Sequence, residues 1–174
     1  MKNKLFSVRE LVFIALFAAV IAISAWIAIP AVVPFTMQTF AVLTCTGLLG
    51  MKCGTAAVCV YILLGAVGLP VFTGFTGGIG ALLSASGGYI IGFIPMSLVC
   101  GMLIKRFGRG ILPLFASMAA GTVVCYFFGS LWFCILYRAS VAAVIISCVL
   151  PFIPFDAVKI ALAVTATRRF MRFV

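Results

Sequence analysis

The sequence predicts an all-α integral membrane protein with six transmembrane helices, and three observations carry this prediction. Of the 174 residues, 66% are hydrophobic, whereas roughly 45–50% is usual in soluble domains. Charged residues are absent from 11–51, 53–104 and 110–137, and each run is long enough for one or more spans of about 20 residues. Basic residues lie in short clusters between these runs, which is typical of membrane topology and not of a nucleic-acid-binding face.

The chain is predicted to form a single membrane domain over residues 1–174, because no repeat, low-complexity tract or soluble segment interrupts the pattern. The expected helices cover residues about 11–29, 37–51, 55–68, 88–104, 111–137 and 154–172. Residues 139–150 are apolar but too few for a span, so we expect a short re-entrant or interfacial helix there.

The first expected helix has a face of small residues. Its alanines at 15, 18, 19, 22 and 25 follow helical spacing and gather on one side. In lipid, small residues at such spacing allow another helix to approach closely. The approaching helix belongs either to this chain or to a partner, and the spacing alone does not distinguish the two.

The segment 65–92 is rich in glycine, with nine of the seventeen glycines. Non-helical backbone at membrane depth survives only where protein or a cavity covers it. We therefore expect a Gly-rich loop between the third and fourth helices that caps an outward-facing pocket, with Phe72, Phe75 and Tyr89 as candidates for an apolar wall. The alternative is an external loop without a function.

Asp156 and Lys159 are the only opposite charges set inside a long apolar run. Pro154 fits the first helical position, which places Asp156 in the first turn and Lys159 at i+3 on the same face. Each charge costs roughly 2.5–3.5 kcal/mol at the bilayer centre on insertion scales. Two interpretations stay open: a pair that holds two helices in register, or a site for a polar ligand.

The distribution of basic residues predicts the topology. With six helices, ten of the twelve fall on one side, and the excess of positive charge places that side, with both termini, in the cytoplasm. The ten are Lys2, Lys4, Arg9, Lys52, Lys105, Arg106, Arg109, Arg168, Arg169 and Arg172.

The composition indicates neither a metal site nor a catalytic site. The chain has no histidine, only two acids, and seven cysteines without a CxxC spacing, so we predict no metal site and no cofactor. An intramembrane enzyme that uses Asp156 or Lys159 would need a neighbouring base or a second acid, and the sequence offers neither. We therefore expect no enzyme activity in this chain.

Four motifs resemble the biotin-binding membrane subunits, or S components, of energy-coupling-factor (ECF) transporters, the BioY family. They are PFTMQTF at 34–40, GLPVFTGFTGG at 68–78, GGYIIGF at 87–93 and PFIPFDAVKIALA at 151–163. Their order and spacing match the family over nearly the whole chain. Two departures are Ser84–Ala85–Ser86, where the family usually has Gly-Pro-Thr, and Phe155, where it often has glycine. The first bears on the shape of the loop, and the second would narrow the pocket mouth.

The resemblance implies the function and a set of site residues. It implies a multi-pass protein of a prokaryotic cell membrane that captures biotin from outside, with ATP hydrolysed by two partner ATPase subunits bound through a transmembrane coupling subunit. The chain itself has no GxxxxGK[ST] phosphate-binding loop. Candidate ligand-binding residues are Asp156, Lys159, Gln38, Phe35, Phe72, Gly77, Gly78 and Tyr89, and candidate contacts to the coupling subunit are Ala15, Ala19 and Ala22. The alternatives are an S component for another vitamin and a structural membrane subunit without a ligand.

Overall fold

The computed structural model describes residues 6–173 and is almost entirely helical. The elements are α1 (Val8–Trp26), β1 (Ala28–Ile29), β2 (Phe35–Thr36), α2 (Gln38–Ala66), the 3-10 helix η1 (Thr73–Phe75), α3 (Ile79–Leu82), α4 (Gly87–Phe107), α5 (Ile111–Tyr137), α6 (Val141–Cys148) and α7 (Ile153–Phe170). Lys2 and Lys4, which entered the count of basic residues, lie outside the described residues.

Four helices among the described residues are long and apolar enough to cross a membrane: α1, α2, α4 and α5. The pair α6 and α7, bent by 55° at residues 149–152, counts as a fifth span when taken together. The sequence predicted six, with separate helices at 37–51 and 55–68; in the structure these two regions fall in the element α2, which is broken at Gly50.

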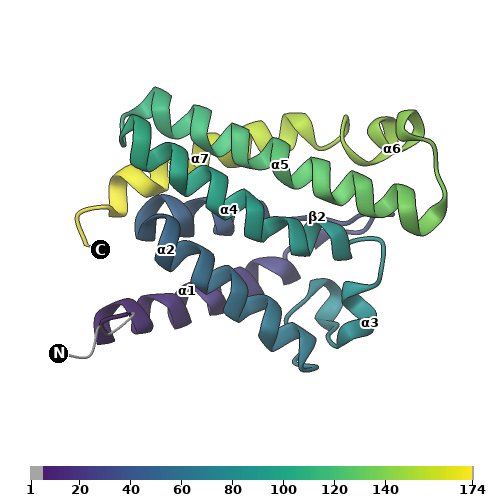
Figure 1. Cartoon of the computed structure of the whole chain (residues 1–174), viewed down its shortest axis with the longest axis horizontal. Helices are drawn as coiled ribbons and strands as arrows, with labels where there is room; N and C mark the ends of the chain where they lie inside the picture. Colours follow the sequence, from purple (N-terminus) through teal and green to yellow (C-terminus); the bar gives the residue numbers. More distant parts are fainter. Residues whose placement is uncertain (1–5, 174) are drawn as a thin grey trace.

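The helices form a layered bundle. In Figure 1 they follow the order α5, α4, α2 and α1 from one edge to the other, and α7 packs on α2 and α5. The start of α1 and the end of α7 lie at one end of the bundle, whereas α6, α3 and the short strands lie at the opposite end (Figure 1). The site-forming start of α7 therefore lies toward the end that is remote from the termini.

The helix α1 begins with a capping box and ends earlier than the sequence predicted. The Ser7 hydroxyl accepts from the Glu10 amide, and the Glu10 carboxylate accepts from the Ser7 amide. The predicted helix 11–29 stops at Trp26, because Ala28–Ile29 pairs with Phe35–Thr36 in an antiparallel two-stranded ribbon. Ile29 precedes Pro30, and a residue before proline favours extended backbone over helix.

The helix α2 breaks at Gly50, where φ is 76° and ψ is −180°. L-residues rarely adopt this conformation, and glycine does so without a steric penalty. The two halves fold back on each other, since a Cβ atom added to Gly54 would lie 2.8 Å from the Cα atom of Thr46. The predicted break at Lys52–Gly54 is thus wrong by a few residues.

The Gly-rich segment is more ordered than the predicted loop. It contains η1 and α3, and the Gly78 amide donates to the Gly65 carbonyl oxygen at 2.7 Å. Phe72 and Thr76 form an isolated β-bridge. The segment therefore folds onto the end of α2 as a compact cap.

Candidate functional site

The centre of the candidate site is the ion pair of Asp156 and Lys159 at the start of α7. Asp156 lies in the first turn, as Pro154 near the helix start predicts, and the Lys159 Nζ donates to Asp156 Oδ1 at 2.8 Å. Both residues are buried, with 3% of the surface of Asp156 and 9% of that of Lys159 exposed.

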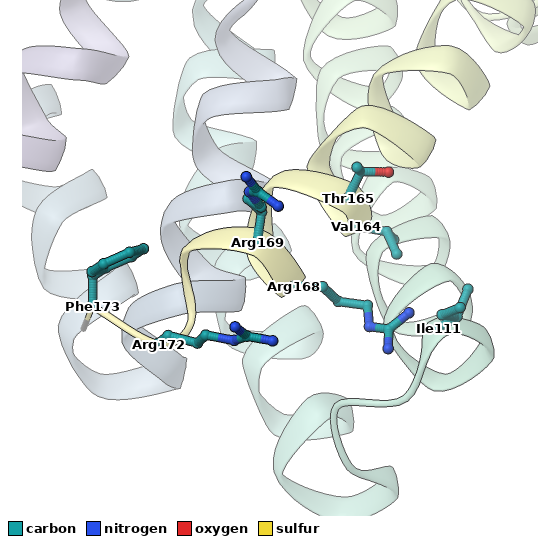
Figure 2. Close-up of a pocket in the computed structure, with 7 residues that line it drawn as sticks. All are labelled: Ile111, Val164, Thr165, Arg168, Arg169, Arg172 and Phe173. Atoms are coloured by element: carbon teal, nitrogen blue, oxygen red, sulfur yellow. The ribbon is translucent and has the colours of Figure 1, made fainter.

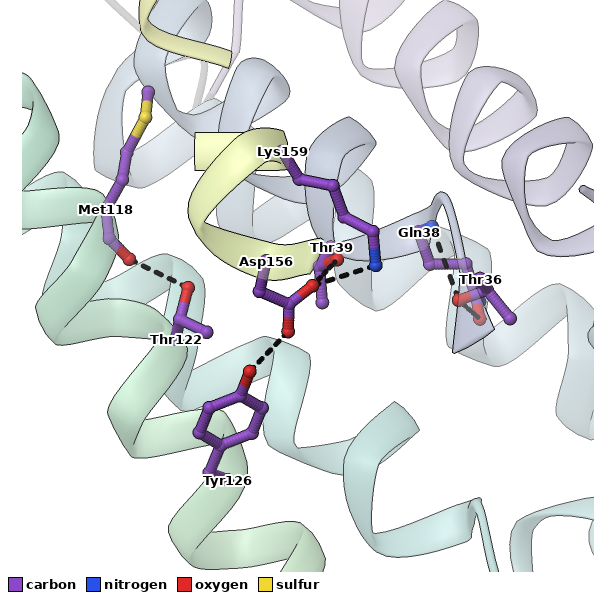
Figure 3. A network of polar contacts seen from close by, with 8 residues as sticks. All are labelled: Thr36, Gln38, Thr39, Met118, Thr122, Tyr126, Asp156 and Lys159. Carbon is purple, nitrogen blue, oxygen red and sulfur yellow. Dashed lines mark hydrogen bonds and ion pairs between the residues drawn. The ribbon is translucent and has the colours of Figure 1, made fainter. Parts of the chain in front are cut away.

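Two hydroxyl groups from other helices complete the surroundings of the carboxylate. Thr39 on α2 donates to Oδ1 at 3.2 Å, and Tyr126 on α5 donates to Oδ2 at 2.5 Å (Figure 3). Asp156 therefore joins α2, α5 and α7 at one point. A carboxylate accepting three hydrogen bonds is well compensated for the loss of water.

The ammonium group of Lys159 keeps unused donor capacity. It carries three N–H donors, and within residues 6–173 its one hydrogen bond is to Asp156. It lines the same cavity as Asp156. The arrangement therefore offers a cation with free donors to an acceptor group on a ligand.

The cavity beside the pair is small and mixes apolar with polar side chains. Its volume is ≈50 Å³, well below the roughly 300–1,000 Å³ of typical small-molecule sites. Its lining is Val33, Pro34, Thr36, Gln38, Thr39, Thr73, Ser86, Tyr89, Ile90, Phe93, Cys125, Tyr126, Phe152, Asp156 and Lys159. These residues come from segments far apart in the sequence, and the Gly-rich segment contributes Thr73, Ser86, Tyr89 and Ile90.

Gln38 is a second buried polar group at the cavity. Its Nε2 atom donates to the Tyr61 hydroxyl at 2.5 Å, and its Oε1 atom accepts from the Thr36 hydroxyl at 3.0 Å. Figure 3 shows Thr36 and Gln38 side by side, across the cavity region from the Asp156 cluster. These bonds hold the amide in one orientation.

The structure brings together half of the predicted ligand-binding residues. Asp156, Lys159, Gln38 and Tyr89 all line the cavity. Tyr89 also donates from its hydroxyl to the Cys148 carbonyl oxygen at 3.3 Å, which ties α4 to the end of α6.

The other four predicted residues do not line this cavity. Phe35 stacks on Phe152, with ring centroids 3.8 Å apart, so Phe152 forms the wall in its place. Phe72 is 1% exposed and packs edge-on against Tyr61 beneath the cap. The amide of Gly78 is already bonded to Gly65, and Gly77 packs against the Leu69 backbone.

Tyr126, Thr39 and Phe93 were missed by the sequence reasoning. Tyr126 lies in the middle of an uncharged apolar run, where nothing local distinguishes it from a lipid-facing aromatic residue. Thr39 had a signal, because it belongs to the polar cluster Thr36, Gln38 and Thr39 at the start of an apolar helix.

The alanine face of α1 is divided between two environments. Ala15 and Ala19 are exposed, whereas Ala22 is buried in the core with Ala18. Ala22 therefore offers little surface to a partner, whereas Ala15 and Ala19 remain available for the predicted contact.

The fold and the site together define a multi-pass membrane protein with a buried ion pair beside a cavity inside its apolar helical bundle. The chain belongs to the BioY family, whose family model matches residues 1–174. This confirms the resemblance that the four motifs indicated.

Similar proteins include a biotin transporter BioY of Thermotoga maritima, 39% identical over 156 residues, which are 89% of this chain and 91% of the relative. A probable biotin transporter BioY of Pyrococcus horikoshii is 37% identical over 162 residues, 92% of this chain and 95% of the relative. Among solved structures, the crystal structure of the S component for biotin from an ECF-type ABC transporter matches with a TM-score of 0.89 and 30% identity. That match covers 96% of this chain and 93% of the solved one.

Proposed function

We propose that this chain is the biotin-binding subunit of an ECF-type transporter. The observation that carries the proposal is the match to the solved biotin S component over nearly the full length of both chains. The buried Asp156–Lys159 pair beside the cavity supplies the chemistry that such a subunit requires. The family is a transporter family, and binding without chemical conversion fits a site whose nearest groups are all engaged in hydrogen bonds.

Biotin presents groups that complement this site. Its ureido ring has two N–H donors and one carbonyl acceptor, and a carboxylate ends its apolar chain. Lys159 has free donors for the carbonyl oxygen or the carboxylate. Asp156 accepts from three donors and a carboxylate offers about four acceptor positions, so Oδ2, which is bonded to Tyr126, can accept a ureido N–H; a second N–H would replace the hydroxyl of Thr39 on Oδ1. The longer Thr39 bond, 3.2 Å, is the weaker of the two.

Entry of biotin requires the cavity to widen, because ≈50 Å³ is too small for a bicyclic ligand. The walls with most freedom are the segment Val33–Thr36 and the turn at Phe152, neither of which is inside a long helix. Both lie at the end of the bundle remote from the termini (Figure 1). We place this end on the outer side of the membrane, with both termini in the cytoplasm.

Transport requires partners in this proposal. A transmembrane coupling subunit and two ATPase subunits supply the energy, since the sequence lacks a phosphate-binding loop of the GxxxxGK[ST] type. The exposed small residues Ala15 and Ala19 on α1 form the contact to the coupling subunit.

Protection against thermal unfolding tests the ligand. A ligand at 100 times its Kd stabilises the folded state by about 2.7 kcal/mol, so biotin should raise the Tm of the purified chain in detergent. Lipoic acid is the matched control, because it carries a carboxylate on an apolar chain but no ureido ring. If another vitamin raises the Tm and biotin does not, that vitamin is the substrate. If no vitamin raises the Tm, the result favours a structural subunit without a ligand.

A further inference from the structure

A second cavity lies at the end of the bundle that carries the chain ends. It measures ≈530 Å³ and is lined by three arginines of α7 and the residues after it, together with apolar side chains: Ile111, Val164, Thr165, Arg168, Arg169, Arg172 and Phe173 (Figure 2). In Figure 2 the guanidinium group of Arg168 points toward Ile111, the first residue of α5. The cavity is far from Asp156, which lies three helical turns earlier in α7.

The three arginines have no anionic partner among residues 6–173. The sequence contains two acidic residues: Glu10, which is bonded to Ser7 and Cys53, and Asp156, which is paired with Lys159. None of the three guanidinium groups forms an ion pair or side-chain hydrogen bond within the described part of the chain. The N-terminus of α5 adds unpaired amides, since its N-cap Gly110 has no side chain to cap them. The charge of this cavity therefore favours an anion as its occupant.

A long apolar groove continues from this cavity along α5 and α7. It measures ≈690 Å³, and its walls include Phe115 and Ile160 at one end and Cys134 and Val141 at the other. Between these ends it passes Tyr126 and Asp156, which also line the cavity of the candidate site. Phe115 is one helical turn beyond Ile111, and Ile160 is one turn before Val164. The groove thus begins where the arginine cavity ends.

We propose that the arginine cavity and the groove together bind one anionic phospholipid. Arg168 and Arg172 hold the phosphate, which matches the forked geometry of guanidinium groups. An acyl chain lies in the groove between α5 and α7.

The groove favours a lipid over other phosphates and over a protein. A soluble phosphate fills only the arginine cavity and leaves the apolar groove empty. An acidic protein segment would have to reach a surface whose neighbours are exposed apolar side chains, such as Leu112, with 77% of its surface exposed, and Val158. Such side chains contact lipid in a membrane protein. The proposal goes beyond biotin binding and does not rest on it.

The test compares two double variants of the full chain, purified in detergent and titrated with phosphatidylglycerol or phosphatidylcholine. Native mass spectrometry measures the bound lipid. Arg168→Gln with Arg172→Gln should weaken phosphatidylglycerol binding roughly 30-fold, because each basic residue near an anionic headgroup contributes about fivefold. Lys105→Gln with Arg106→Gln is the matched control, since it removes the same charge from the same end without lining the cavity.

Two further variants address the groove and the risk of misfolding. Ala157→Trp fills the groove and should lower phosphatidylglycerol retention, whereas Ala161→Trp, on the same helix but outside both cavities, should not. If the double arginine variant does not fold, Arg172→Gln alone, beyond the end of α7, should still weaken binding about fivefold.

Three results would overturn the proposal. If both double variants lose the same amount of phosphatidylglycerol affinity, the effect comes from general surface charge and not from the arginine cavity. Inorganic phosphate that binds the parent chain as tightly as phosphatidylglycerol would assign the cavity to a soluble anion. Unchanged lipid binding, with assembly of the transporter lost in the arginine variant, would make the cavity a protein contact.

Discussion

Tyr126 on α5 donates a hydrogen bond of 2.5 Å to Oδ2 of Asp156 on α7. The bond links the two helices at the buried ion pair and fixes the direction of the carboxylate. Lys159 and Thr39 both use the other oxygen, so Tyr126 alone restrains Oδ2. We infer that Tyr126 positions Asp156 for the ligand.

Tyr126→Phe removes this donor and keeps the ring. We expect biotin affinity to fall roughly tenfold, because a hydrogen bond to a charged group contributes about 1.5–3 kcal/mol. Titration calorimetry measures the change, and Tyr137→Phe, which alters an exposed tyrosine at the end of the same helix, is the control. Equal affinities for the two variants would contradict a positioning role.

Asp156→Asn keeps the size of the side chain and removes its charge. The loss of one charge-assisted hydrogen bond should lower biotin affinity roughly ten- to hundred-fold. Lys159→Met should also weaken binding, because it leaves Asp156 buried without its cation. If both variants fold and bind biotin as the parent does, the pair is structural.

Exposed and buried alanines of α1 should respond differently to tryptophan. Ala15→Trp or Ala19→Trp should weaken assembly with the coupling subunit and leave biotin binding by the isolated chain intact, because both positions are exposed. Ala22→Trp should impair folding, since Ala22 is 7% exposed and packs in the core. Co-purification with the coupling subunit and thermal unfolding separate the two effects. If Ala15→Trp and Ala19→Trp both assemble normally, the exposed alanine face of α1 is not the contact to the coupling subunit.

Gly101→Ala tests the packing of α4 against the break in α2. The added Cβ atom would lie 2.5 Å from the Cα atom of Met51, which cannot move without shifting backbone. Overpacking of this kind costs about 1–3 kcal/mol, so the Tm should fall. Gly80→Ala is the control, because nothing lies within 4 Å of the added atom. A Tm equal to that of the control would show that the two segments are less tightly packed than described.

Labelling of single cysteines tests the proposed topology. In a cysteine-free background, positions near Lys52 and Arg109 should react only from the cytoplasmic side, and positions near Thr76 only from outside. The two sets lie at opposite ends of the bundle. If both sets of positions react from the same side, the proposed topology is wrong.

The sequence predicted local features of the site better than long-range ones. The pairing of Asp156 with Lys159 follows from helical spacing and the position of Pro154, and both were predictable. The contact of Tyr126 with Asp156 depends on how α5 packs on α7, and a uniformly apolar run carries no information about which face is buried.

The Gly-rich segment shows a second limit of prediction from the sequence. Its composition indicated unusual backbone, which the positive φ angles of Gly68, Gly74 and Gly78 bear out. Gly77 and Gly78 were predicted as ligand-binding residues, but neither lines the cavity, and the Gly78 amide is bonded to the Gly65 carbonyl oxygen. Composition indicates where backbone is irregular but not where its hydrogen bonds go.

The small cavity beside Asp156 has a kinetic consequence. A space of ≈50 Å³ holds about one or two water molecules. A biotin molecule that collides with this closed form therefore cannot bind. Capture then proceeds at the rate set by the open fraction, below the diffusion limit. Escape of a bound solute waits for the same opening, which lengthens its residence time. Slow opening thus lowers the rates of capture and release alike, and does not by itself make binding tighter.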